Sequence, residues 1–543
     1  MPGDGTDPPG PHGDKSADKT DDVMQSEPTD DGTDSSDTDD IVRSIGKSGI
    51  VVFLGTFLEL GIAFVVKLLV AQSLVPASYG EVTVALTVLN VTAIISRLGF
   101  ATGIPRNAPR YEGADRRGVL VSALQLNLLV STAIGIAIFV AAGLIADWLR
   151  NPALIPVLRV IAVGVPAIPL MRISLSGTQA VGRSSPKVIV QNLTHPLIRI
   201  VFVVLAIAVG SSPVTVVAAY VAANWVGAIA AIYFLIRYTT ILDSSIGWTP
   251  KHREMLHFSL PLMATTGIGF LLGNTDTLMI QYFQGSADVG VYDIGYTVAQ
   301  MLSVGLGSLS YLFLPNISEL HAESKYEEIV HLYKLVTKWA VFVTLPMYLL
   351  LIFFPSTLIA YTFGPRYSAA APYLVILATG YFSRVLVGPG QQALSAFDDT
   401  QVILKISVLA AALNIILNAS LLLTVGTIGA AVASSFSLVV MNACYAYWLH
   451  TTYEVNSVSR SLVGPVVVFV AVSGTIYAVV RTTVGRPQML GIVALLAVTG
   501  VVYVLSILSF GGLQEDDVML VRSAEQRLGI DLEPIKRVAR LFL

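Results

Sequence analysis

The sequence predicts an all-α integral membrane protein with about fourteen transmembrane helices, built as two six-helix pseudo-twofold lobes plus two C-terminal helices. Composition, recurrent apolar runs and an internal repeat support this prediction. The mean hydropathy is +0.71, and 54% of the 543 residues are apolar while only 13% are charged. Soluble domains carry about 25% charged residues, and their interiors are too small to hide so much apolar surface. Lipid must therefore be the solvent for most of this chain.

The apolar runs set the expected number of spans. A hydrocarbon core of about 30 Å requires about 20 apolar residues of helix. By that measure the predicted spans are 49–72, 81–104, 118–142, 153–176, 188–210, 212–236, 257–282, 289–314, 333–356, 369–395, 402–424, 426–448, 462–481 and 488–511.

Lys and Arg residues predict the orientation of these spans. If the N-terminus is cytoplasmic, the basic loop 105–117 and the basic tail 512–543 both lie inside. The loops on the other side carry few cations, among them Arg150 and Arg366. Because cytoplasmic loops are enriched in Lys and Arg, we expect a multi-pass plasma-membrane protein with both termini in the cytoplasm.

The two tails differ in charge. Residues 1–40 hold twelve Asp and one Glu against two Lys, a net charge of −11, so the remainder carries +8 within a total of −3. With few large apolar groups, residues 1–40 are predicted to be a disordered acidic cytoplasmic tail. Residues 512–543 are predicted to be a second cytoplasmic tail, whose stretch 533–543 is either an amphipathic helix on the inner leaflet or an ordinary cytosolic helix.

Segments of the first half recur in the second half. Gln72 matches Gln281 at an offset of 209, and residues 158–164 match 374–380 at an offset of 216. A third pair, 209–223 and 425–439, repeats the offset of 216. Two copies of six spans have the same topology and are related by an axis along the membrane normal. The predicted domains are therefore an N-terminal lobe at 41–240, a C-terminal lobe at 241–450 and two extra spans within 451–511.

Composition and loop lengths disfavour several classes of function. There is one cysteine, Cys444, and His is scarce, so we expect no metal site, no cofactor and no disulfide. An embedded glycan ligase or polymerase would need a large extramembrane loop and a catalytic cluster, and the sequence offers neither. We therefore expect a protein that is not an enzyme and does not bind nucleic acid.

Charged residues inside the predicted spans are candidates for a cavity between the lobes. Each costs roughly 2.5–3.5 kcal/mol at a helix centre, so such residues usually face protein or water. One interpretation is a cationic cavity for an anionic head group, since guanidinium suits phosphate oxygens. The other is that they snorkel or pair within the bundle, and Glu59 could bind a coupling cation or neutralise an Arg. The candidates from span position are Glu59, Lys67, Arg97, Arg172, Arg199, Asp276 and Arg384, while Arg159 and Asp293 are further charged positions in the spans.

The segment 388–392 reads GPGQQ within the tenth predicted span. Proline removes a backbone donor and glycine weakens a helix. One interpretation is a hinge, where an unwound segment would offer polar groups to a cavity, and the other is a static kink satisfied by neighbouring helices.

Several stretches resemble a known family. Residues 68–110, LLVAQSLVPASYGEVTVALTVLNVTAIISRLGFATGIPRNAPR, resemble the opening of the polysaccharide biosynthesis and oligosaccharide flippase family, an O-antigen-flippase-like, MATE-like branch of the MOP superfamily. Residues 276–302 resemble its second-half hairpin, and residues 363–382 and 388–405 resemble its span 10 region. The resemblance implies a flippase for polyprenyl- or dolichyl-linked sugars, with membrane lipids and glycosyltransferases of the same pathway as partners. It also adds Arg106, which closes GFATGIPR, and supports Asp276 in DTLMI as cavity candidates.

Alternatives to the flippase remain open on the residues alone. A cation-coupled multidrug exporter of the MATE type would prefer acidic cavity residues, and here arginines outnumber acids deep in the spans. A structural partner of a glycan assembly complex would need no cavity.

Overall fold

A computed structural model describes residues 55–239, 241, 243, 245, 247–456, 460–483 and 489–509. Within these residues the chain forms α-helices with short 3-10 and π-helical segments and no strand, which confirms the all-α class. The predicted tails 1–40 and 512–543, and Arg486, lie outside the described residues.

Helices follow one another through the first half of the chain. An unlabelled helix, Gly55–Ser73, comes first. It is followed by α2 (Pro76–Ser96), α3 (Phe100–Asn107), η1 (Ala108–Arg110), α4 (Gly113–Trp148), α5 (Leu154–Gly164), α6 (Ala167–Ala180), α7 (Ser185–Lys187), η2 (Val188–Thr194), α8 (His195–Val209) and α9 (Pro213–Tyr238).

The second half has a similar series. It consists of α10 (His252–Phe283), α11 (Ser286–Gln300), α12 (Leu302–Ala322), α13 (Tyr326–Phe353), α14 (Pro355–Thr362), η3 (Pro365–Ala370), α15 (Ala371–Val387), α16 (Gly390–Ala396), α17 (Thr400–Val425), α18 (Thr427–Tyr453), α19 (Arg460–Thr483) and α20 (Met489–Ser509).

Eleven helical segments of the described chain are long and apolar enough to cross a membrane. Helices also cover the remaining predicted spans, as α10, the pair α11 and α12, and α20. The chain is therefore a multi-pass membrane protein, while the count of fourteen stays a prediction.

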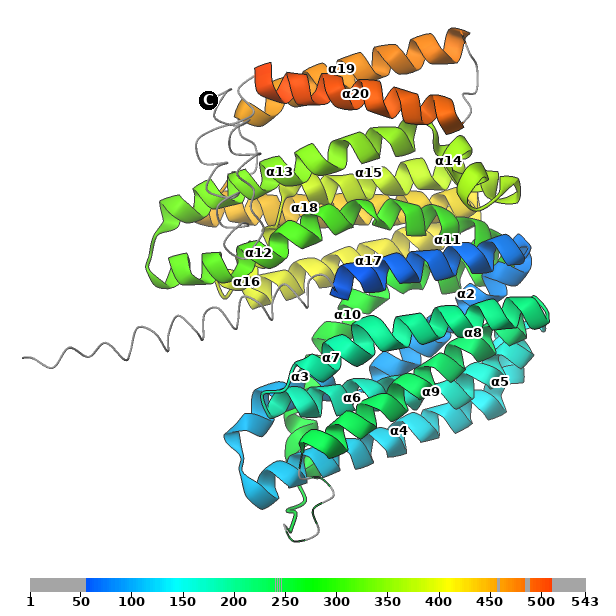
Figure 1. Ribbon diagram of the computed structural model, residues 1–543, viewed down its shortest axis with the longest axis vertical. Coiled ribbons are helices and arrows are strands. Elements are labelled where there is room, and N and C mark those ends of the chain that lie inside the picture. Colours follow the sequence, from blue (N-terminus) through cyan, green and yellow to red (C-terminus); the bar gives the residue numbers. More distant parts are fainter. Residues whose placement is uncertain are drawn as a thin grey trace, which may run out of the picture. The chain divides into compact units, whose positions relative to one another are not determined.

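The helices of each half pack mainly among themselves. In the first half α6 packs against α9 and α3, α4 against α5, and α8 against α9 (Figure 1). In the second half α17 packs against α18, α15 against α18 and α13, and α12 against α13. The last two helices pair with each other, and α19 contacts α13. The boundaries of the two lobes remain a prediction from the repeat.

The two halves meet at a contact between α2 and α11. A Cβ added to Gly80 would lie 1.7 Å from the carbonyl oxygen of Ser286, and one added to Gly290 would lie 2.1 Å from that of Pro76. Both pairs are related by an offset of 210 residues. Each glycine thus meets its own counterpart in the repeat, which is the geometry of a pseudo-twofold axis passing between them. Only residues without a side chain allow backbones to approach so closely.

Further contacts near this axis are also reciprocal. Gln72 donates from Nε2 to the carbonyl oxygen of Thr362 (2.6 Å), while Gln281 donates to that of Leu149 (3.1 Å). The matched glutamines therefore each tie one half to the other. We call this end of the bundle, where the connections 74–75, 149–153 and 284–285 lie, the hairpin end.

Two arginines reinforce the hairpin end with the same symmetry. Arg366 donates to the carbonyl oxygen of Gln72. Arg150 lies 4.6 Å from the ring centroid of Tyr282 and donates to its hydroxyl (3.4 Å). The two arginines are 216 residues apart, the offset found in the sequence repeat.

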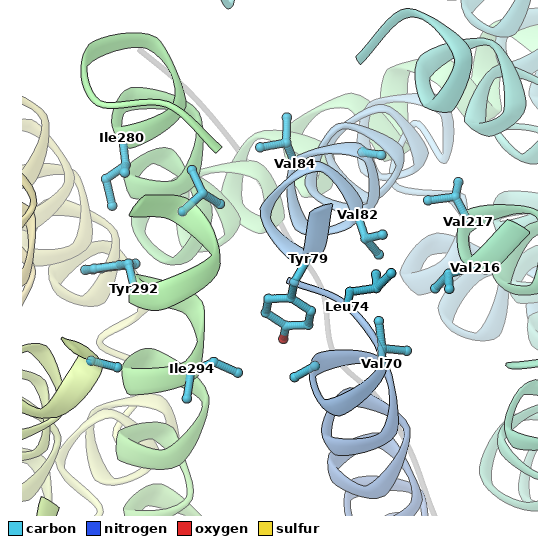
Figure 2. Close-up of a cluster of buried hydrophobic side chains, with 14 of the residues drawn as sticks. Val70, Leu74, Tyr79, Val82, Val84, Val216, Val217, Ile280, Tyr292 and Ile294 are labelled. Atoms are coloured by element: carbon cyan, nitrogen blue, oxygen red, sulfur yellow. The ribbon is translucent and has the colours of Figure 1, made fainter. Parts of the chain in front are cut away.

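A buried apolar cluster crosses from one half to the other (Figure 2). Val216 and Val217 of α9 lie on one side of α2, and Ile280 of α10 and Ile294 of α11 lie on the other. Tyr79 of α2 is 2% exposed between them. The halves are therefore joined by continuous packing rather than by polar contacts alone.

The helix is interrupted at GPGQQ. Helix α15 ends at Val387 and α16 begins at Gly390. Gly388 has φ +84°, a conformation that disfavours other residues. A Cβ there would lie 2.0 Å from Oγ1 of Thr337, so α13 also requires glycine at this position.

Candidate functional site

A cavity of about 320 Å³ lies between the halves. Its wall is built from the Gly55–Ser73 helix, α2, α8 and α9 on one side and from α10 and α11 on the other. Of the predicted candidates, Lys67, Arg199 and Asp276 line this cavity. Asp293 lines it too, so the charged lining consists of two cations from the first half and two carboxylates from the second.

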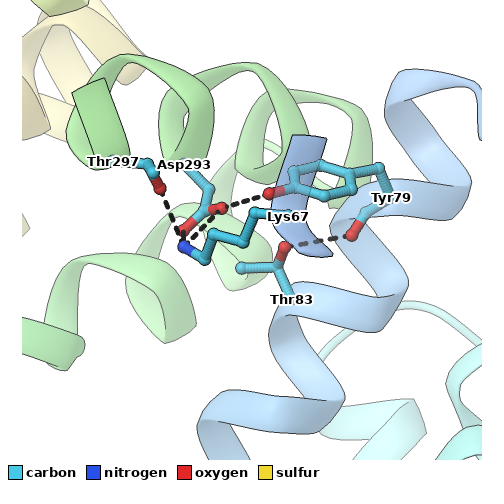
Figure 3. A network of polar contacts seen from close by, with 5 residues as sticks. All are labelled: Lys67, Tyr79, Thr83, Asp293 and Thr297. Carbon is cyan, nitrogen blue, oxygen red and sulfur yellow. Dashed lines mark hydrogen bonds and ion pairs between the residues drawn. The ribbon is translucent and has the colours of Figure 1, made fainter. Parts of the chain in front are cut away.

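Lys67 and Asp293 join the two halves across the cavity (Figure 3). The Nζ of Lys67 lies 3.1 Å from both carboxylate oxygens of Asp293 and donates to Oγ1 of Thr297 (2.8 Å). Tyr79 donates from its hydroxyl to Oδ2 of Asp293 (2.6 Å). Asp293 therefore accepts hydrogen bonds from the Gly55–Ser73 helix and from α2, and its carboxylate neutralises the charge of Lys67.

Arg199 is differently placed. It projects from α8 into the cavity, and its guanidinium carbon lies 5.7 Å from the ring centroid of Tyr220. Its Nε is buried and has no hydrogen-bond partner. A buried donor without a partner costs about 1–3 kcal/mol, so this group is available to an incoming anion.

Local structure before α8 helps position this region. Residues Val188–Thr194 form a π-helix, a rare conformation that often marks functional sites. It places Gln191 in hydrogen-bond contact with Glu59 and lets Asn192 donate to Oγ1 of Thr56 (3.2 Å). The π-helix, which continues into α8, thus contacts the Gly55–Ser73 helix.

A second group of charges lies beside the cavity lining. Glu59 is close enough to Arg172 and Lys187 for attraction, while Arg172 and Arg97 repel each other. The Nε of Arg172 is buried without a hydrogen-bond partner, and that of Arg97 donates to the carbonyl oxygen of Ala93 (3.2 Å). This first-half cluster contains one carboxylate and three cations, so its net charge is positive.

Asp276 sits in a different environment. It is 2% exposed, and its carboxylate accepts from the hydroxyl of Tyr292 (2.7 Å), from Nδ2 of Asn418 (2.8 Å) and from the hydroxyl of Ser434. Asn414 in turn donates to Ser434 (2.9 Å). Among the described residues, no cationic side chain pairs with this carboxylate. Such a set of oxygens can hold a proton or a hard monovalent cation.

The structure does not bring the other candidates to this cavity. Arg106 lies exposed in the last turn of α3. Arg384 is half-buried on α15, near Tyr381 and Tyr445. In the part of the chain that the structure describes, no group of three or more His, Cys, Asp or Glu has metal-site geometry.

Sequence reasoning missed the aromatic and amide part of the site. Tyr79, Tyr220 and Tyr292 line the cavity but carry no charge that would mark them. Asn414 and Asn418 were detectable, because two amides four residues apart in an apolar run share one face of a helix.

The connection between the halves packs against the start of α4, at the end of the bundle opposite the hairpin end. Lys251 Nζ lies 3.7 Å from Asp115 and 3.5 Å from Glu254. Tyr111 donates a hydrogen bond to Glu254, and that bond raises the pKa of Tyr111 above its usual value. A Cβ on Gly118 would lie 2.0 Å from the carbonyl oxygen of Thr249.

Known proteins share both sequence and fold with this chain. It is 22% identical over 432 residues to the uncharacterized membrane protein MJ1068 of Methanocaldococcus jannaschii, covering 74% of this chain and 83% of the relative. It is 21% identical over 207 residues to the probable low-salt glycan biosynthesis flippase Agl15 of Haloferax volcanii, covering 38% of this chain and 43% of that protein. The lipopolysaccharide biosynthesis protein WzxC of Escherichia coli is 22% identical, with 60% of this chain and 64% of WzxC covered.

Solved structures show the same fold at low identity. The lipid II flippase MurJ, in an inward closed conformation, superposes with a TM-score of 0.68 at 13% identity, covering 88% of this chain and all of MurJ. An inward-facing multidrug resistance MATE transporter of the MOP superfamily gives a TM-score of 0.57 at 14% identity, covering 73% and 94%.

Two family models match the sequence. The MatE model matches residues 261–420. The model described as polysaccharide biosynthesis protein matches residues 45–321, just over half of the chain. The chain thus belongs to the polysaccharide biosynthesis protein family.

Proposed function

We propose that this protein is a flippase that moves a polyprenyl- or dolichyl-(di)phosphate-linked oligosaccharide across the cell membrane by alternating access, for the synthesis of surface polysaccharide or glycoprotein. The observation that carries the proposal is Arg199, which lines the cavity between the two halves and has a buried Nε without a hydrogen-bond partner. Guanidinium groups bind phosphate with charge-assisted hydrogen bonds. The names of Agl15 and MurJ, which describe flippases, agree with this role.

The chemistry of the cargo explains why a protein is needed. Burying each sugar hydroxyl without a partner costs about 2–7 kcal/mol, so an oligosaccharide crosses lipid extremely slowly by itself. A polar cavity removes most of that barrier while the lipid tail stays in hydrocarbon. Small-molecule sites span about 300–1,000 Å³, and this cavity of about 320 Å³ is at the lower end. The halves must therefore separate before an oligosaccharide can enter.

The remaining residues have proposed roles in the same process. The cluster of Glu59, Arg97 and Arg172 attracts the anionic head group toward Arg199, and Lys67 balances Asp293 until the halves separate. Arg106 and Arg384 stay candidates for contacts in another conformation. Glycosyltransferases of the same pathway are the proposed partners.

The proposed orientation places both termini in the cytoplasm and the hairpin end outside. Cys444 is the single cysteine of the chain, so a Cys444→Ala background allows clean labelling. Ser211→Cys, at an exposed position between α8 and α9, should react with an impermeant maleimide added outside intact cells. Ser184→Cys, exposed before α7, should react only after permeabilisation. The reverse pattern would overturn this orientation.

Transport is tested with purified protein in liposomes that contain a fluorescent lipid-linked oligosaccharide. The protein should expose inner-leaflet cargo to an external quencher, and Arg199→Gln should slow this exposure. Arg253→Gln, at an exposed position at the start of α10, is the matched control and should transport at the wild-type rate. Equal rates for Arg199→Gln and wild type would refute the role of the cavity arginine.

A second candidate function is cation-coupled export of amphipathic drugs. It is favoured by the MatE match at 261–420 and by the buried carboxylate of Asp276. The same liposomes, loaded with a cationic dye and given a sodium or proton gradient, separate the two candidates. Gradient-dependent dye efflux without oligosaccharide flipping would replace the flippase proposal.

A further inference from the structure

A surface recess lies away from the central cavity, on the first half of the chain. It has a volume of about 410 Å³ and is bounded by α4, α5 and α9. Apolar side chains form most of the wall, with a single charged residue among them. The lining residues are Phe139, Arg159, Val160, Val163, Ala218, Val221 and Ala222.

Small residues create this recess. Ala218 and Ala222 are one turn apart on α9 and exposed, so neither fills the space beside α5. Val163 is 57% exposed and Phe139 is 49% exposed at its rim. Because the chain spans a membrane, the medium that reaches this surface is lipid, and acyl chains are the groups available to fill it.

Arg159 gives the recess a chemical preference. Its guanidinium carbon lies 5.7 Å from the ring centroid of Phe139. Arg159 is the sixth residue of α5 and Phe139 is the tenth residue from the end of α4. At 1.5 Å per residue they lie about 8 Å and about 14 Å below the hairpin end.

The guanidinium therefore bends along the recess instead of extending to water beyond the helix end. A lipid head group at the hairpin end is therefore the nearest anionic group that the membrane offers to Arg159. Among the described residues, no carboxylate pairs with Arg159.

We propose that the recess binds one anionic phospholipid, with its phosphate on Arg159 and an acyl chain along Phe139, Ala218 and Ala222. A guanidinium at the head-group boundary prefers the phosphate oxygens that accept its donor fork. The apolar floor prefers a hydrocarbon chain to a polar ligand. The proposal does not depend on the transport function, because the recess and the central cavity share no lining residue.

The test uses the full chain in detergent with added phosphatidylglycerol or phosphatidylcholine, and native mass spectrometry to count bound lipids. The wild type should retain one phosphatidylglycerol more tightly than the rest. Arg159→Gln should weaken that binding at least about tenfold, since hydrogen bonds to charged groups contribute about 1.5–3 kcal/mol. Ala222→Phe, which fills the recess and keeps the charge, should weaken it as well.

Arg481 is the matched control. It also lies beside an aromatic ring, 5.9 Å from the centroid of Tyr477, but outside the recess. Arg481→Gln should leave the tight phosphatidylglycerol in place. Equal retention in Arg159→Gln and wild type, or equal loss in Arg481→Gln, would overturn the proposal, and so would retention of phosphatidylcholine with the same affinity.

Discussion

The two walls of the central cavity treat their buried charges in opposite ways. On the second-half wall, Asp276 accepts from Tyr292, Asn418 and Ser434. On the first-half wall, Arg199 has a buried Nε without a partner. Both positions carry a cost of leaving water; both oxygens of Asp276 accept hydrogen bonds that offset it, whereas the Nε of Arg199 has no such partner.

This difference indicates that Asp276 contributes to the stability of the fold, whereas Arg199 can bind a ligand. A carboxylate that accepts hydrogen bonds on both oxygens contributes to stability, because its removal leaves buried donors without their acceptor. An unsaturated donor loses little stability on removal, but its ligand loses affinity. Substitution of Asp276 should therefore mainly lower stability, whereas substitution of Arg199 should mainly slow transport.

The largest effect is expected at Asp276. Asp276→Ala would remove the acceptor of the buried hydroxyls of Tyr292 and Ser434, and should destabilise the protein by about 2–5 kcal/mol. Thermal unfolding in detergent should show a clearly lower melting temperature. Asp276→Asn keeps the shape of the side chain, so its melting temperature should lie between those of the wild type and Asp276→Ala. A wild-type melting temperature for Asp276→Ala would contradict a stabilising role for this carboxylate.

Arg199→Gln should give the reverse pattern. Oligosaccharide flipping in liposomes should slow at least about tenfold, since the lost hydrogen bonds to a charged phosphate contribute about 1.5–3 kcal/mol. The melting temperature should stay the same or rise, because a poorly paired buried charge is removed. A fall in melting temperature with unchanged flipping would assign Arg199 to the fold instead.

A smaller effect is expected where the walls meet. Lys67→Met and Asp293→Asn should each lower stability, and the double variant should lose less than the sum, with a coupling of about 1 kcal/mol. The estimate is modest because 38% of the Lys67 side chain is exposed. Additive losses in this double-mutant cycle would show that the ion pair does not join the halves.

The smallest effect is expected where the connection between the halves contacts the start of α4. Tyr111→Phe removes the hydrogen bond to Glu254 at an exposed position, so stability should fall by at most about 0.5 kcal/mol. Since folding raises the pKa of Tyr111, its contribution is complete below the usual tyrosine pKa of about 10 and disappears as pH rises through the folded value. Melting curves of wild type and variant should therefore differ equally from pH 6 to 9 and converge above pH 10. A difference that grows with pH would contradict this sign.

Hydropathy and the repeat were sufficient to predict the helical membrane fold. Gln72 and Gln281 were matched by sequence, and the structure gives them equivalent contacts. The break between Val387 and Gly390 was also predictable, because proline and glycine act on the local backbone.

The pairing of charges was less predictable. Lys67 and Asp293 are 226 residues apart, and their contact depends on how two halves meet. Arg384 and Arg199 were both candidates because each is a charged residue inside a predicted span, yet Arg384 lies near Tyr381 and Tyr445, away from the cavity lining. Depth is set by sequence position, while the direction that a side chain faces is set by the packing of its helix.

The contact between Gly80 and Gly290 constrains how such a protein can evolve. After a gene segment is duplicated, the copies are free to diverge wherever each packs on its own helices. A residue that touches its own counterpart has no such freedom, because a larger side chain on either copy collides with the other copy's backbone. The pseudo-axis is therefore where the ancestral identity of the two copies should persist longest.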